Sequence, residues 1–205
     1  MNKLSVMGVG IYLSVMSVVT FGDSDAALLV YQPCIACHGA AGQGNEALGA
    51  PAIAGQGEAY LQRQLKYFKS GVRGSQPEDS QGAQMRAMAA LLSVEDVSRI
   101  AKFLSDLPVV EFETAPSGDL KNGNNYYHAK CGACHGGQAE GNPKLNAPRL
   151  AGLDATYLKR QFKNFQQGRR GGDPKDTYGR QMKMMATTLP ADEDLDDVIA
   201  YIQTL

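Results

Sequence analysis

The pattern Cys-x-x-Cys-His occurs twice in this 205-residue chain, and the second copy starts 97 positions after the first. The copies contain all four cysteines of the chain and two of its three histidines. Cys-x-x-Cys-His is the attachment signature of a c-type haem, in which both thiols bond to vinyl groups of the porphyrin and the adjacent imidazole ligates the iron. The pattern predicts two covalently bound haem c groups, held by Cys34, Cys37 and His38 and by Cys131, Cys134 and His135.

Two other kinds of site also use paired cysteines. A redox dithiol uses Cys-x-x-Cys, but it does not require a histidine directly after the second cysteine in both copies. A structural zinc ion needs four ligands, whereas these two pairs lie far apart in the sequence and each has its own histidine. Covalent haem is therefore the favoured interpretation.

The composition sets outer limits on the function and the size of the core. A formal net charge of -1 argues against nucleic-acid binding. The length fits one medium domain or two small ones. Because lobes of about ninety residues bury little apolar surface on their own, a porphyrin in each would supply much of the interior.

Residues 1–26 are predicted to be a signal peptide or an N-terminal membrane anchor. Lys3 precedes an uncharged apolar run at residues 4–21, and residues 24–26 offer a small-x-small cleavage site. Cleavage is favoured, but a run of about 18 apolar residues also suffices to span a bilayer. A cut after Ala26 would leave only seven residues before Cys34, which keeps the anchor alternative open. In either case the globular part lies in the periplasm.

The remainder of the chain is an internal repeat with an offset of 97 residues. Residues 34–93 align with residues 131–190 without a gap, and about 29 of the 60 positions are identical. The repeat predicts two homologous domains at residues 27–107 and 119–205, joined by a linker at residues 108–118.

Helical signals recur in both copies, and no segment shows the alternation of a strand. The fold class predicted is therefore all-α, with each domain wrapped around one haem. Apolar spacing and capping residues predict helices at residues 25–32, 58–70, 93–106, 120–130, 155–167 and 191–204.

Each iron also accepts a sixth ligand, and a methionine thioether would favour ferrous iron and raise the reduction potential. His128 aligns with Tyr31 and Met184 aligns with Ala87, so neither can be a solution shared by both copies. Both remaining candidates lie in a Gly-x-Gln-Met-x-x-Met-Ala segment, expected to be a loop before the last helix. Spacing leaves two pairs open: Met85 with Met182, or Met88 with Met185.

The two halves resemble class I cytochrome c domains, and their tandem arrangement resembles the dihaem cytochromes of the c4 type. Besides Cys-x-x-Cys-His-Gly and the methionine segment, the resemblance rests on two further patterns. These are Asn-x-x-Leu-x-Ala-Pro at residues 45–51 and 142–148, and Ala-Gly at residues 54–55 and 151–152.

The resemblance implies which residues complete each site. In this family the axial methionine stands eight positions before the residue that opens the last helix, which selects Met85 and Met182. The family also implies that the carbonyl groups of Pro51 and Pro148 accept a hydrogen bond from the axial histidine and fix its ring. One departure is Pro190, which stands where the family has a Ser, Thr or Asp cap.

An iron with both axial positions filled by protein has no open place for a substrate. The sequence thus predicts an electron-transfer protein, not an enzyme, that relays electrons from a quinol-cytochrome c reductase or a dehydrogenase to a terminal oxidase or reductase. The alternative is the electron-accepting cytochrome subunit of a flavoprotein or quinoprotein dehydrogenase. A dihaem peroxidase is disfavoured, because it needs a vacant or displaceable ligand and both methionine segments are intact.

Overall fold

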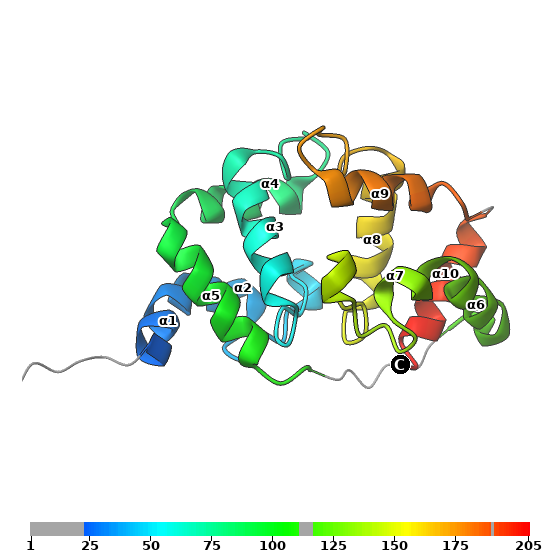
Figure 1. The fold of residues 1–205 in the computed structure, drawn as a ribbon, viewed down its shortest axis with the longest axis horizontal. Coiled ribbons are helices and arrows are strands. Elements are labelled where there is room, and N and C mark those ends of the chain that lie inside the picture. Colours follow the sequence, from blue (N-terminus) through cyan, green and yellow to red (C-terminus); the bar gives the residue numbers. More distant parts are fainter. Residues whose placement is uncertain (1–22, 111–116, 190) are drawn as a thin grey trace, which may run out of the picture.

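The structure is a computed structural model that describes residues 23–110, 117–189 and 191–205 (Figure 1). The apolar run at residues 4–21, the middle of the predicted linker and Pro190 lie outside the described residues. Within the described part the chain forms helices and two isolated β-bridges, and no strand, so the predicted all-α class is confirmed there. No helix in this part is long and apolar enough to cross a membrane.

Each half of the chain forms a lobe with the same order of helices. Lobe 1 contains α1 (Asp23–Tyr31), α2 (Ile35–His38), α3 (Glu58–Ser70), α4 (Ser80–Ala90) and α5 (Val94–Asp106). Lobe 2 contains α6 (Leu120–Tyr126), α7 (Gly132–His135), α8 (Ala155–Gln166), α9 (Thr177–Ala186) and α10 (Asp192–Ile202). Figure 1 shows α3 and α8 facing each other across the middle of the molecule, with α4 and α9 both along the upper edge.

The methionine segments are helical, which corrects the loop expected from the sequence. Asp79 starts α4 by accepting a hydrogen bond from the Gly82 amide at 3.1 Å, and Asp176 starts α9 by accepting one from the Gly179 amide at 2.8 Å. Such caps satisfy amides that a helix start leaves free. The residues that follow are mostly good helix formers such as Gln, Met, Arg and Ala.

The helix predicted at residues 120–130 also differs from expectation in its last turn. It is α-helical to Tyr126 and continues as a π-helical turn at Tyr127–Cys131. In lobe 1 the matching stretch is a 3-10 turn at Gln32–Cys34. A π turn takes up one more residue than the α-helix around it, so lobe 2 carries one extra residue here.

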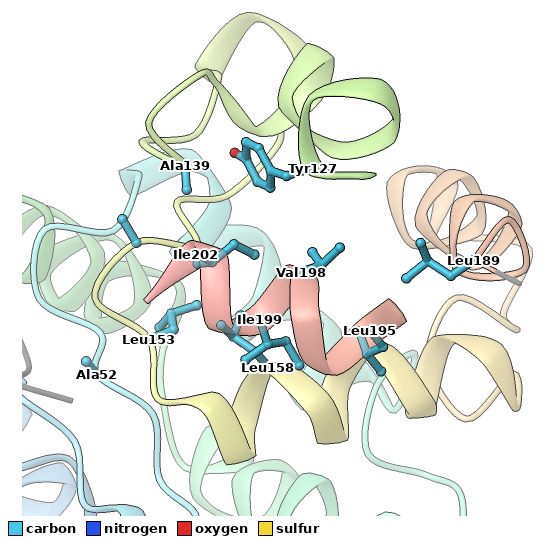
Figure 2. Packing of buried hydrophobic residues seen from close by; sticks show 11 residues of the cluster. Ala52, Tyr127, Ala139, Leu153, Leu158, Leu189, Leu195, Val198, Ile199 and Ile202 are labelled. Atoms are coloured by element: carbon cyan, nitrogen blue, oxygen red, sulfur yellow. The ribbon is translucent and has the colours of Figure 1, made fainter. Parts of the chain in front are cut away.

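The last helix of each lobe supplies more of the buried apolar cluster than any other helix. In lobe 1 the buried cluster is Tyr31, Leu61, Ile100, Ala101 and Leu104. In lobe 2 the cluster is larger and centres on Leu195, Val198, Ile199 and Ile202 of α10 (Figure 2). Ala52 of lobe 1 belongs to this second cluster, so the lobes share apolar contacts and do not merely touch.

The start of the predicted linker is packed against both lobes. A Cβ atom added to Gly55 would come within 2.5 Å of the Val109 side chain, and one added to Gly152 would come within 2.7 Å of the Val110 carbonyl oxygen. Both glycines also have positive φ angles, of 65° and 73°, which side chains disfavour. The repeated Ala-Gly pattern thus makes room for the chain that joins the lobes.

Reciprocal hydrogen bonds show that the lobes meet about a pseudo-twofold axis. Arg63 of α3 donates to the carbonyl oxygen of Asn146 at 2.8 Å. Its repeat partner Arg160 of α8 donates to the carbonyl oxygen of Gly49 at 2.5 Å. Gly49 and Asn146 are themselves 97 residues apart, so the same contact is made once in each direction.

Candidate haem sites

The two histidines of the Cys-x-x-Cys-His patterns are buried and identically oriented. Nδ1 of His38 lies 2.9 Å from the carbonyl oxygen of Pro51, and Nδ1 of His135 lies 2.9 Å from that of Pro148. A carbonyl oxygen can only accept, so Nδ1 carries the proton and donates it. In the neutral ring this leaves Nε2 unprotonated, which is the form that ligates a metal.

Burial reinforces this neutral state. His38 and His135 are only 5% and 8% exposed. Removal from water lowers the pKa of both imidazoles, and the hydrogen bonds to the prolines oppose this effect only in part. Both rings are thus neutral at physiological pH and ready to hold iron.

A buried tyrosine anchors the end of each haem-binding segment, a role that the sequence reading missed. The hydroxyl of Tyr31 donates to the Gly39 carbonyl at 2.8 Å, and the hydroxyl of Tyr127 donates to the Gly136 carbonyl at 2.6 Å. Tyr31 therefore corresponds to Tyr127 and not to His128, because the π turn shifts the register by one residue. The repeat offset of 97 residues gave no signal for this pairing, because the two tyrosines are 96 residues apart.

His128 is not positioned to ligate a haem iron. This agrees with the prediction, although the alignment used to exclude it was wrong by one residue. Its ring is exposed, and Nε2 lies 3.1 Å from the hydroxyl of Tyr201 on α10. It does not line the cavity that contains His135.

The cysteines do not have the properties of a redox dithiol. Burial raises the pKa of the Cys34 thiol, and it raises the pKa of the Cys131 thiol to about 11. A redox-active dithiol needs the opposite shift, since its nucleophile is the thiolate. Cys37 and Cys134 are exposed at the surface of the lobes. The raised pKa values of Cys34 and Cys131 keep these two thiols neutral, which suits covalent attachment to a porphyrin better than dithiol redox chemistry.

A cavity in lobe 2 brings together the groups predicted to hold the second haem. Cys131, Cys134 and His135 line it together with Met182 and Met185 of α9. Much of the remaining lining is apolar, from Leu150, Leu153, Leu158, Phe162, Leu195, Val198 and Ile199. A flat apolar macrocycle with iron at its centre matches these walls.

The candidate methionines differ in burial in the same way in both lobes. Met85 and Met182 are half-buried, whereas Met88 and Met185 are each 38% exposed. Met184 is 66% exposed. Both Met182 and Met185 line the cavity, so lining alone does not separate them.

The polar end of the cavity has side chains that could bind the carboxylates of a haem. Residues of lobe 1, among them Tyr60 and Gln64, line this end with Arg170 of lobe 2. The Nε atom of Arg170 is buried and has no hydrogen-bond partner in the structure. Haem carries two carboxylates, and a guanidinium is well suited to bind them. The cavity thus fits a haem in both its apolar walls and its charged end.

The arginines were not among the sequence-predicted site residues. Arg73 and Arg170 stand at equivalent positions, so both copies of the repeat have an arginine there. The repetition could have indicated a functional residue, but an arginine in a predicted loop is usually exposed to solvent. Only the burial seen in the structure distinguishes these arginines from ordinary surface residues.

Comparisons with known proteins agree with this geometry. The cytochrome c family matches twice, at residues 25–108 and 120–205. Cytochrome c4 of Azotobacter vinelandii is 32% identical over 196 residues, which cover 90% of each protein. A protein named thiosulfate dehydrogenase electron acceptor, from Thiomonas intermedia, is 38% identical over 151 residues, or 69% of this chain and 66% of that protein.

A solved structure extends the similarity to the arrangement of the lobes. The crystal structure of reduced cytochrome c4 from Pseudomonas stutzeri superimposes with a TM-score of 0.74, at 29% identity, over 90% of this chain and all of that one. The family match, the full-length similarity and the two Cys-x-x-Cys-His patterns support two covalently bound haem c groups. The chain belongs to the cytochrome c family, as a dihaem electron-transfer cytochrome of the c4 type.

Proposed function

We propose that the chain relays electrons in the periplasm, from a quinol-cytochrome c reductase to a terminal oxidase or reductase, through one haem in each lobe. The observation that carries this proposal is the cavity of lobe 2. It is lined by Pro51, Ile53 and Leu61 of lobe 1 as well as by the haem-binding residues of lobe 2. Two haems in such lobes would lie close enough for electrons to pass between them inside one protein.

The iron ligands in this proposal are His38 with Met85 and His135 with Met182. The lower exposure of Met85 and Met182 supports them over the outer methionines, because a ligand to a buried iron must point inward. The proline carbonyls hold each imidazole at a set angle and increase its basicity. With both axial positions filled, the protein's part is to exclude water and to adjust the reduction potential.

The proposed domains are residues 27–107 and 119–205, with the joining segment at 108–118. Residues 1–26 would direct export, as a cleaved signal peptide or as an anchor through residues 4–21. Mass spectrometry of the native protein reports the haem count and the mature N-terminus together. An N-terminus at or near Ala27 supports cleavage, and an intact Met1 supports the anchor.

A spectroelectrochemical titration tests the relay itself. We expect low-spin c-type spectra and two one-electron steps, together with reduction by a quinol-cytochrome c reductase and oxidation by a terminal oxidase. A high-spin haem that binds carbon monoxide or cyanide rapidly would contradict the proposal, because it would show an open coordination position.

The second candidate is the electron acceptor of a dehydrogenase. The similarity to the Thiomonas protein named thiosulfate dehydrogenase electron acceptor favours it. Stopped-flow mixing with a thiosulfate dehydrogenase plus thiosulfate, and separately with a quinol-cytochrome c reductase, discriminates between the two. The faster reductant at equal concentration identifies the electron donor, and co-purification with a catalytic subunit would favour the dehydrogenase.

A further inference from the structure

Four side chains between the lobes form a closed ring of hydrogen bonds, which we call the interlobe clamp: Gln64, Arg73, Gln161 and Arg170. Arg73 donates to the Oε1 atoms of Gln64 at 2.7 Å and of Gln161 at 2.9 Å. Arg170 donates to Gln161 Oε1 at 3.0 Å and to Gln64 Oε1 at 3.1 Å. Each arginine is thus bonded to a glutamine of its own lobe and to one of the other lobe.

The clamp concentrates positive charge in a buried place. Arg73 and Arg170 are 6% and 7% exposed. They lie over the rings of Phe68 at 4.4 Å and Phe165 at 4.5 Å. Their Nη atoms also donate to the hydroxyl groups of the facing lobe's tyrosine, Tyr157 at 3.4 Å and Tyr60 at 2.8 Å.

No carboxylate comes within ion-pair distance of either guanidinium in the described part of the chain. The nearby buried carboxylate of Asp176, which lines the same cavity, acts on Arg170 only from a longer distance and offsets part of the charge. The acceptors are the neutral oxygens of glutamine and tyrosine. Buried charges are normally paired with an opposite charge, because removal from water is costly. Two like charges held by the same two acceptors add mutual repulsion.

The surroundings respond to this excess of positive charge. Burial alone would raise the pKa of the Tyr60 hydroxyl, but the charges of Arg170, Arg73 and Arg63 outweigh it and lower that pKa. A site that favours the anionic form of a tyrosine favours other anions too. The interface therefore has the electrostatic character of an anion site.

Unsatisfied hydrogen-bond donors also favour an anion at this interface. The Nε atoms of Arg73 and Arg170 are buried and have no hydrogen-bond partner. Gln64, Gln161 and Arg170 line the cavity in which the haem-binding residues of lobe 2 lie. The anions that a haem would bring to this end of the cavity are its carboxylates.

We propose that the interlobe clamp binds porphyrin carboxylates of both haems, so that the charge of each arginine sets the reduction potential of both irons. Because Arg73 and Arg170 bind the same two glutamines, each positive charge lies at the interface and acts on the haems of both lobes. Positive charge near an iron favours the reduced form, which has one positive charge less. The proposal rests on the proposed function, in that both haems must be present.

The test uses the full chain with both haems and the substitutions Arg170→Gln and Arg73→Gln. The midpoint potential of each haem is measured by redox titration, with the two haems distinguished by their own NMR methyl signals. We expect each single substitution to lower both potentials. Lys159→Gln is the matched control, since it removes one positive charge from an exposed position of α8 where its ion pair is with Asp196. We expect it to leave both potentials unchanged.

Two results would overturn the proposal. A shift confined to the haem of the substituted lobe would make each arginine a local residue, and unchanged potentials would make the clamp purely structural. Arg170→Lys serves as the conservative variant and as the test where a glutamine variant does not accumulate. It restores the charge, so we expect both potentials to stay closer to those of the parent than in Arg170→Gln. Potentials as low as in that variant, or lowered for only one haem, would contradict the proposal.

The haem count separates this outcome from a failure of the proposed function. A protein with fewer than two haems would contradict the proposed relay. A protein with two low-spin haems whose potentials ignore both arginines would contradict the clamp alone.

Discussion

The two lobes hold their haem-binding residues in the same geometry but support them differently. The distance from histidine Nδ1 to the proline carbonyl is 2.9 Å in both. The turn that leads into the first cysteine is a 3-10 turn in lobe 1 and a π turn in lobe 2. The hydrogen bond that orients each histidine is thus maintained while the surrounding helices diverge, and the one extra residue of lobe 2 is accommodated locally.

The packing of the first helix on the last illustrates this divergence. In lobe 2, Gly123 of α6 lies against the carbonyl oxygen of Asp197 on α10, and the side-chain amide of Asn122 donates to Asp194 and Asp197. The register that pairs Tyr31 with Tyr127 places Ala27, which is buried, at the position of Gly123. Lobe 2 therefore has a closer helix pair, held by polar contacts as well as apolar ones.

The largest expected effect comes from removing one haem at a time. The pair Cys34→Ala with Cys37→Ala, and the pair Cys131→Ala with Cys134→Ala, should each reduce the haem count from two to one. We expect lobe 1 to lose more structure without its haem, since its buried cluster is the smaller of the two. Mass spectrometry gives the haem count, and thermal unfolding by circular dichroism gives the loss of structure. Equal losses in the two variants would show that core size does not decide this difference.

The next effect distinguishes the inner from the outer methionine in each lobe. Met182→Ala should remove an iron ligand, so the second haem becomes high-spin and its potential falls, because the thioether no longer stabilises ferrous iron. Met185→Ala should keep the low-spin spectrum and cost about 1 kcal/mol or less of stability, as expected for a partly exposed side chain. Met85→Ala and Met88→Ala repeat the test in lobe 1. A high-spin spectrum in the outer variants would instead assign the outer pair as ligands.

A smaller effect should follow from filling the close helix contact of lobe 2. A Cβ atom at position 123 would come within 2.0 Å of the Asp197 carbonyl oxygen, so Gly123→Ala must push α6 away from α10. Overpacking of this kind costs about 1–3 kcal/mol. Chemical denaturation measures the loss. Gly137→Ala is the control in the same lobe, because nothing lies within 4 Å of its added Cβ, and an equal loss there would exclude the helix contact as the cause.

The smallest effect contrasts the starts of the two last helices. Ser93 accepts a hydrogen bond from the Asp96 amide at 3.0 Å, and Asp96 accepts one from the Ser93 amide at 2.9 Å. In α10 only the second half exists, from the Ala191 amide to Asp194 at 3.1 Å, since alanine has no side-chain oxygen. Ser93→Ala should cost about 1 kcal/mol, and Ala191→Ser should gain up to a similar amount. Unfolding free energies of both variants check the pair, and a stabilising Ser93→Ala would contradict it.

The local patterns of the chain predicted the chemistry and the helices. Cys-x-x-Cys-His encodes covalent attachment within five residues, and the prediction of two haem c groups agrees with the cytochrome c matches. Apolar spacing located α3, α5, α8 and α10 to within two residues at either end. Such features depend on neighbours in the sequence, so a sequence contains them directly.

Other features depended on contacts that no local pattern contains. From the sequence, the methionine segments were predicted to be loops, and the gap-free alignment paired Tyr31 with His128. The caps at Asp79 and Asp176 and the π turn before Cys131 correct both interpretations. Tyr31 lies three residues before Cys34, and Tyr127 lies four residues before Cys131. Both spacings are compatible with one face of a helix, so only the tertiary contacts of the tyrosines revealed the shift.

By itself, then, the sequence determined that the chain binds two haems in duplicated helical lobes. The tertiary structure alone decided how the lobes meet, with Arg73 and Arg170 buried between them and bonded across the interface. The physical reason is that covalent attachment and helix formation are local, whereas burial of a charge depends on which surface packs over it. Identical arginines at an offset of 97 residues acquire a shared role only when two lobes pack about a common axis.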